Sequence, residues 1–98
     1  MATTNPAEPD DEVDGNRLTG AMARDLLEYL AESIVEEPEA VSVEMSEHGG
    51  RVDLRLSVAA SDMGRVIGRK GRVANALRAL VRVAGAREGV EATVDIVD

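Results

Sequence analysis

Residues 64–75 read Gly-Arg-Val-Ile-Gly-Arg-Lys-Gly-Arg-Val-Ala-Asn, and their centre is the segment Gly68-Arg69-Lys70-Gly71. Two glycines enclose two cations, and glycine permits backbone conformations and close approaches that other residues do not. A β-branched apolar pair precedes the glycines, and a helical repeat of apolar residues follows them. The free N–H groups and the dipole at the start of that helix favour an anion at the same point. The stretch therefore predicts a clamp for a phosphate backbone.

The segments before this loop show regular apolar spacing. Helical spacing predicts a first helix from Leu18 to about Glu36, which Pro38 ends. Its buried stripe is expected to consist of Leu18, Met22, Leu26, Tyr29, Leu30 and Ile34. Tyr29 is the only aromatic residue, and this stripe places it in the core. Alternating apolar and polar residues then predict a β-hairpin over residues 41–58, with its turn at 48–50.

The segments on either side of the loop predict two helices and a last strand. Ser61 is a suitable N-cap for a short helix through Ile67, and Gly85 is placed to end a helix that begins at about Arg72. The buried positions of these helices are expected to be Met63, Val66, Ile67, Val73, Ala76, Leu77, Leu80 and Ala84. Alternation over residues 90–96 predicts a third strand, parallel to the second because a long crossover joins them. The expected class is α+β, with three strands and with three helices on one face.

The run Val66-Ile67-Gly68-Arg69-Lys70-Gly71-Arg72-Val73 resembles the I-I-G-x-x-G-x-x-I signature of KH domains, whose G-x-x-G loop clamps the backbone of single-stranded nucleotides. The order of elements over residues 18–97 is similar to that of the small bacterial single-KH RNA-binding proteins of the KhpA type. This similarity covers about four fifths of the chain. It implies a type II KH domain, with the order α-β-β-α-α-β, over residues 18–98.

The resemblance also implies which residues would contact RNA. The two glycines would let the loop approach the backbone, Arg69 and Lys70 would supply charge, and an apolar wall would come from Val66, Ile67, Val73 and part of the second strand. Arg78 and Arg82 are expected to be mostly surface charge. The complete predicted RNA-binding set is Arg65, Val66, Ile67, Gly68, Arg69, Lys70, Gly71, Arg72 and Asn75.

The charge of the chain is unevenly distributed. The net charge is −8, yet seven of the eleven Lys and Arg residues lie between positions 61 and 89. Screening at physiological salt lets such a local cluster attract phosphate on an acidic protein. Residues 1–17 are rich in Pro, Asp and Glu, and this composition predicts a disordered acidic tail. That tail either only aids solubility or competes with RNA for the basic cluster.

The composition also argues against several kinds of site. There is no cysteine, and His48, the only histidine, falls in a polar turn, so we expect no disulfide, metal site, cofactor or catalytic residue. No secretory signal or apolar run of membrane-spanning length is evident, which favours a cytoplasmic protein without a membrane partner.

Two functions remain open at this point. The first is a non-catalytic protein that clamps single-stranded RNA, as an RNA chaperone or post-transcriptional regulator. The second is a protein–protein adaptor with a KH fold. The resemblance implies self-pairing to a homodimer, or pairing with a larger Jag-type KH protein to a heterodimer. Acidic residues in place of Arg69 and Lys70 would have favoured the adaptor, and both positions are basic.

Overall fold

The computed structural model describes residues 20–98, so the predicted acidic tail at residues 1–17 and the predicted helix start at Leu18 lie outside the described residues. The helices and strands are α1 (Ala21–Ile34), β2 (Ser42–His48), β3 (Arg51–Ser57), α2 (Met63–Ile67), α3 (Arg72–Arg87) and β4 (Glu91–Val97). This order confirms the predicted α-β-β-α-α-β arrangement. None of the helices that the structure describes has both the length and the apolar character needed to cross a membrane.

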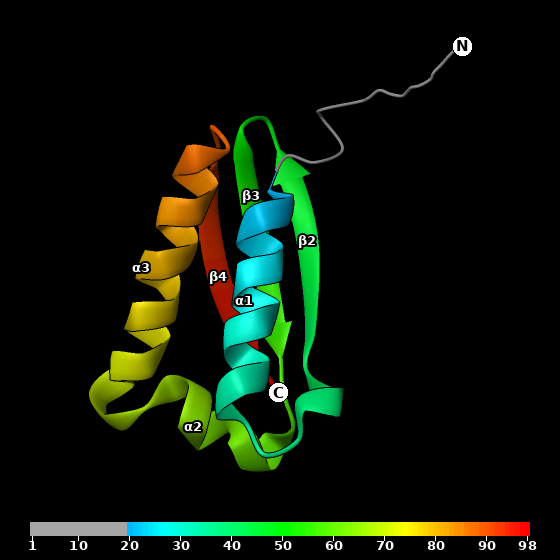
Figure 1. Ribbon diagram of the computed structural model, residues 1–98, viewed down its shortest axis with the longest axis vertical. Coiled ribbons are helices and arrows are strands. Elements are labelled where there is room, and N and C mark those ends of the chain that lie inside the picture. The colour runs from blue at the N-terminus through cyan, green and yellow to red at the C-terminus, as the bar shows by residue number, and fades with distance from the viewer. Residues whose placement is uncertain (1–19) are drawn as a thin grey trace.

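The three strands form one mixed sheet in the order β2-β3-β4. Strands β2 and β3 pair antiparallel, whereas β3 and β4 pair parallel with Arg51 opposite Glu91. The inward side chains of β3 are Val52, Leu54 and Leu56, all of them buried. Helices α1 and α3 lie side by side across one face of the sheet, and α2 lies at the end of this layer in contact with both (Figure 1). The predicted sheet with helices on one face is therefore confirmed.

The buried face of α1 agrees only in part with the predicted one, since Leu26 and Leu30 pack against the core as predicted but the centre of the face lies elsewhere. Its buried residues are Ala23, Leu27 and Ala31, whereas Met22 is 56% exposed and Tyr29 is 67% exposed. Because alanine has a short side chain, this face lets α1 approach α3 and the sheet more closely than the predicted row of large residues would. The prediction that Tyr29 lies in the core is wrong.

Helix α3 buries Leu77 and Ala84 as predicted but not the rest of the predicted stripe, and it extends beyond its predicted end. Leu80 was expected in the core and is 50% exposed, while Val81 is fully buried. Gly85 does not end the helix. A Cβ atom at Gly85 would lie 2.7 Å from the Cβ atom of Ala92, so the glycine lets α3 pack directly on β4. The helix continues to Arg87, and Gly89 takes the positive φ angle (+79°) in the turn that follows.

The segment before α2 is fixed by a buried carboxylate. Asp62 is fully buried, and its two oxygens accept the backbone N–H groups of Glu36 at 3.0 Å and Glu37 at 3.1 Å. The prediction of Ser61 as an N-cap is wrong, because its hydroxyl donates to the carboxylate of Glu37 at 3.2 Å instead. Asp62 thus ties the chain that leaves α1 to the start of α2.

Asp62→Asn is expected to lower the melting temperature by several degrees at neutral pH, and by progressively less in acid. The N–H group of Glu36 lowers the pKa of Asp62, burial opposes this shift, and the N–H group of Glu37 and the charge of Arg65 lower the pKa further. A depressed folded pKa gives stability that is present above the unfolded value of about 4 and is lost as the pH falls through the folded value. Thermal unfolding of both proteins between neutral and acidic pH would measure this. A difference that stays constant down to the lowest pH would contradict the assignment.

Candidate nucleic-acid interface

The two glycines of the loop have different structural roles. Gly68 follows α2 with φ 77° and ψ 168°, and a Cβ atom there would lie 2.8 Å from the backbone nitrogen of Val73. Gly71 has φ 75°, donates its N–H to the carbonyl of Gly68 at 3.0 Å, and would place a Cβ atom in open space. Gly68 therefore packs the loop against α3, and Gly71 leaves room for a ligand.

The tip of the loop presents two cations in an unusual backbone conformation. Lys70 has φ 56°, and no other non-glycine residue between positions 20 and 98 has a positive φ. This conformation costs an L-residue roughly 1–2 kcal/mol. Arg69 and Lys70 are both exposed, and their N–H groups donate to no backbone carbonyl of the described residues. The tip thus offers free donors and positive charge to solvent.

The two arginines that flank the loop, Arg65 and Arg72, lie in different surroundings. Arg72 begins α3 and is exposed, and it forms no ion pair within residues 20–98. Arg65 faces the other way: its guanidinium lies 3.0 Å from the carboxylate of Glu36 and 3.3 Å from that of Asp62. The charge of Arg65 is therefore largely compensated within the protein, while that of Arg72 remains available beside the loop.

The predicted apolar wall is only partly accessible. Val66 is 0% exposed and belongs to the core, whereas Ile67 and Val73 are partly buried and reach the surface. Asn75 is exposed, and its side-chain oxygen accepts a hydrogen bond from Arg78 at 3.4 Å. Of the predicted apolar residues on α2 and α3, Ile67 and Val73 are thus the ones that a ligand can touch.

The strand beside α3 is β4, whereas the sequence predicts that part of the second strand, β3, contributes to the apolar wall. Strand β3 is central in the sheet, and β4 covers its side toward α3. A groove of about 360 Å³ runs between α3 and β4, and it is lined by Arg78, Arg82, Glu91, Ala92, Thr93 and Val94. The helical spacing of the two arginines was visible in the sequence, but only the parallel pairing of β4 places them over a groove.

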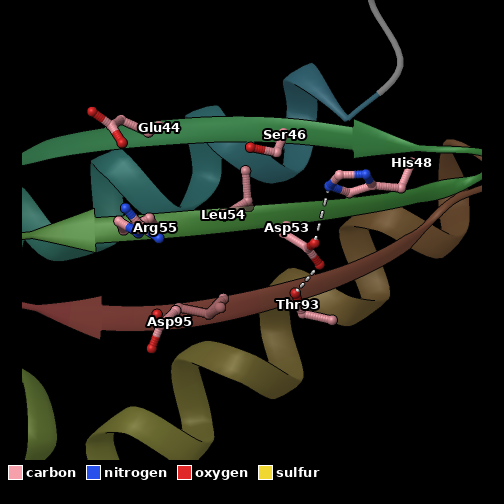
Figure 2. Close-up of a pocket in the computed structure, with 9 residues that line it drawn as sticks. Glu44, Ser46, His48, Asp53, Leu54, Arg55, Thr93 and Asp95 are labelled. Carbon is pink, nitrogen blue, oxygen red and sulfur yellow. Dashed lines mark hydrogen bonds and ion pairs between the residues drawn. The ribbon is translucent and has the colours of Figure 1, made fainter.

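The other face of the sheet is polar (Figure 2). The Asp53 carboxylate accepts the Thr93 hydroxyl at 2.7 Å and lies 3.2 Å from Arg51 and 3.6 Å from His48. The hydrogen bond from Thr93 lowers the pKa of Asp53, desolvation opposes the shift, and Arg51 and His48 lower the pKa further. His48 is exposed, and the part of the chain from Gly20 onward contains no cluster of three His, Asp or Glu side chains suited to a metal ion. The polar groups around Asp53 on this face are therefore paired with one another within the protein.

Solved structures show that the fold is a known one. The crystal structure of a variant of Aquifex aeolicus Era bound to GDP·AlF4⁻ matches with a TM-score of 0.64 at 17% identity. A crystal structure of Era in complex with MgGDPNP and nucleotides 1506–1542 of 16S ribosomal RNA matches with a TM-score of 0.62 at 16% identity. Each match covers 94% of this chain and 34% of the Era chain. The likeness shows that the chain has the type II KH fold.

Sequence comparison gives the family. The RNA-binding protein KhpA of Clostridium perfringens is 38% identical over 74 residues, which cover 76% of this chain and 99% of that protein. The RNA-binding protein KhpA of Bacillus subtilis is 35% identical over 81 residues, which cover 83% of this chain and 100% of that protein. The family model described as "KhpA/KhpB, KH domain" matches residues 24–96. With its fold and its Gly68–Gly71 loop, the chain belongs to the KhpA/KhpB KH-domain family.

Proposed function

We propose that this protein binds single-stranded RNA, with the Gly68–Gly71 loop on the phosphate backbone and the bases toward the groove between α3 and β4. The observation that carries the proposal is the exposed loop tip, where Lys70 holds a left-handed conformation beside Arg69. The family is non-catalytic, and its curated relatives are named RNA-binding proteins. A cytoplasmic role as an RNA chaperone or post-transcriptional regulator is part of the proposal.

The loop suits a phosphate for three physical reasons. The N–H groups of Arg69 and Lys70 can donate to phosphate oxygens, and their side chains add positive charge. The open space at Gly71 lets the backbone of the nucleic acid approach closely. The first turn of α3 adds the positive end of a helix dipole, because α3 begins directly after the loop. Such contacts fix the position of the strand without reading its sequence.

The other predicted residues would contribute to RNA binding in different ways. Arg72 and Asn75 extend the polar surface from the loop along α3, and Ile67 with Val73 gives an apolar edge for a sugar or base. Arg65 acts mainly through its ion pairs with Glu36 and Asp62, which orient α2 and so the loop. Val66 supports the loop from the core.

Arg69→Asp/Lys70→Asp is expected to weaken RNA binding at least tenfold, because the substitution places two negative charges where phosphate binds. Fluorescence anisotropy of a labelled single-stranded RNA pool, at two salt concentrations, measures the affinity. The matched control is Arg24→Asp/Arg87→Asp, which changes the net charge equally at two positions away from the loop. Circular dichroism would verify that both variants fold. An equal loss in both variants would show that net charge, and not the clamp, governs binding.

A second candidate function, pairing with another KH domain, is favoured by the exposed apolar residues on the helical layer. Met22 and Tyr29 on α1 are 56% and 67% exposed, and Leu80 and Val83 on α3 are 50% and 59% exposed. Met22 and Tyr29 lie two helical turns apart on one side of α1, and Leu80 and Val83 lie one turn apart on α3. Exposed apolar residues that gather on one side of a helix are typical of an interaction surface. The partner would be a second copy of this chain or a larger Jag-type KH protein.

Tyr29→Glu/Val83→Glu is expected to convert a self-paired protein into a monomer, since each substitution puts a charge into an apolar contact. Light scattering coupled to size-exclusion chromatography would give the mass of both proteins across a concentration series. Glu32→Gln, an exposed change on α1, serves as the control. A parent protein that stays monomeric at high concentration would leave pairing with a different KH protein as the remaining form of this function.

A further inference from the structure

The groove beside β4 contains two arginines that the phosphate clamp does not use. Arg78 and Arg82 lie one helical turn apart on α3, and both line the groove. The Nε of Arg78 donates to the carbonyl of Val94 at 3.3 Å, and its Nη1 donates to the side-chain oxygen of Asn75 at 3.4 Å. Two contacts therefore hold this guanidinium over the groove before any ligand arrives, with further N–H groups still available.

The second arginine adds further donors to the groove. Arg82 is exposed and forms no ion pair within the described part of the chain. The floor is formed by the small residue Ala92 and by Val94. Glu91 alternates with the buried Ala92, so its side chain projects, like that of Thr93, on the face of the sheet opposite the helices. The helix side thus offers donors above an apolar floor.

This pattern matches one base better than the other three. Guanine carries two acceptors, N7 and O6, on one edge, and arginine binds this pair with two parallel hydrogen bonds. Adenine places its amino donor beside N7, where it would meet the arginine donors. Cytosine and uracil have no N7 at all.

We infer that the groove between α3 and β4 selects a guanine of single-stranded RNA, with Arg78 and Arg82 on N7 and O6. The inference rests on the proposed RNA binding and adds a base preference to it. Backbone contacts at the Gly68–Gly71 loop hold the strand regardless of sequence, so the arginine groove supplies the discrimination.

The test compares labelled oligoadenylate with the same strand carrying one central guanosine, using fluorescence anisotropy on the full chain. The parent protein is expected to bind the guanosine strand about tenfold more tightly. 7-Deazaguanosine, which lacks N7, is expected to lose most of that gain, whereas inosine, which keeps N7 and O6, is expected to retain it. These probes test the N7–O6 edge of the base without altering the protein. Equal binding of the adenosine and guanosine strands would overturn the inference.

Variants assign the preference to the side chains. Arg82→Lys keeps the charge at an exposed position but loses the planar pair of donors, so it is expected to remove the guanosine preference. Arg87→Lys, on the same helix but outside the groove, is the control. A full guanosine preference in Arg82→Lys would overturn the inference.

The same titrations separate this inference from the proposed function. If the parent binds both strands equally and Arg69→Asp/Lys70→Asp binds neither, the clamp stands and only the guanine preference fails. If the parent binds no strand at either salt concentration, the proposed RNA binding fails, and the guanine preference fails with it.

Discussion

Gly85→Ala is expected to lower the free energy of unfolding by about 1–3 kcal/mol, the usual cost of overpacking a core. The new methyl group would lie 2.7 Å from the Cβ atom of Ala92 and 3.2 Å from the carbonyl oxygen of Val90. Both atoms belong to the backbone or are bonded to it, so no side-chain rotation relieves the contact. Helix α3 must therefore move away from β4, and its contacts with the sheet loosen.

Urea or thermal unfolding measures this loss, and the chain offers a matched control. Gly64 is also helical, but a Cβ atom there would have no neighbour within 4 Å. Gly64→Ala is therefore expected to be neutral or to stabilise the fold by up to about 1 kcal/mol, since alanine favours helix over glycine. Equal effects of the two substitutions would show that close packing at Gly85 is not what requires glycine.

Gly68→Ala is expected to reduce RNA affinity at least tenfold in a protein that still folds. The φ and ψ angles of Gly68, 77° and 168°, lie in a region that is essentially restricted to glycine, and holding alanine there costs of order 1–3 kcal/mol. The added Cβ atom would also contact the backbone nitrogen of Val73 at 2.8 Å. The loop must then rearrange, which displaces the N–H groups that would bind phosphate.

Anisotropy titration at a temperature where both proteins are fully folded measures this effect. Gly49→Ala is the control, because Gly49 also has a positive φ angle (+45°) but lies in the β2–β3 turn with open space around it. It is expected to lose some stability and no affinity. If folded Gly68→Ala bound RNA as tightly as the parent protein, RNA binding would not depend on this loop geometry.

The strands and the loop were predictable from sequence because their signals are local. Alternation over residues 42–48, 51–57 and 91–97 reports one buried and one exposed face, and the G-x-x-G signature lies in four consecutive residues. Their pairing followed from connection length: a short turn gives an antiparallel pair, and a long crossover permits a parallel one.

The helix faces were harder to predict because each long helix carries two apolar stripes. On α1, the stripe with Met22 and Tyr29 is more hydrophobic than the one with Ala23 and Ala31, so periodicity favours the wrong face. The structure buries the small residues because they permit close packing between layers. Such a choice depends on the neighbouring elements, which the sequence of one helix does not contain.

The site was predictable at the loop and not beyond it. The ion pairs of Arg65 join α2 to Glu36, a residue beyond the end of α1, and thus depend on tertiary structure. The groove that Arg78 and Arg82 line exists only because β4 lies beside α3. No pattern within one segment of the sequence predicts that contact. Residues brought together from distant segments were therefore missed, while those within one segment were found.

The parallel pairing of β3 with β4 also determines the order in which the chain can assemble. The pairs that it forms, such as Arg51 with Glu91, lie 40 positions apart, whereas the β2–β3 hairpin closes through a short turn. Hairpins form within microseconds, but distant strands meet only after a large loss of chain entropy. The chain that must be closed in this step comprises α2, the Gly68–Gly71 loop and α3. The Gly68–Gly71 loop therefore lies inside the longest-range strand pairing of the sheet, and the two strands that enclose it meet only in this late step.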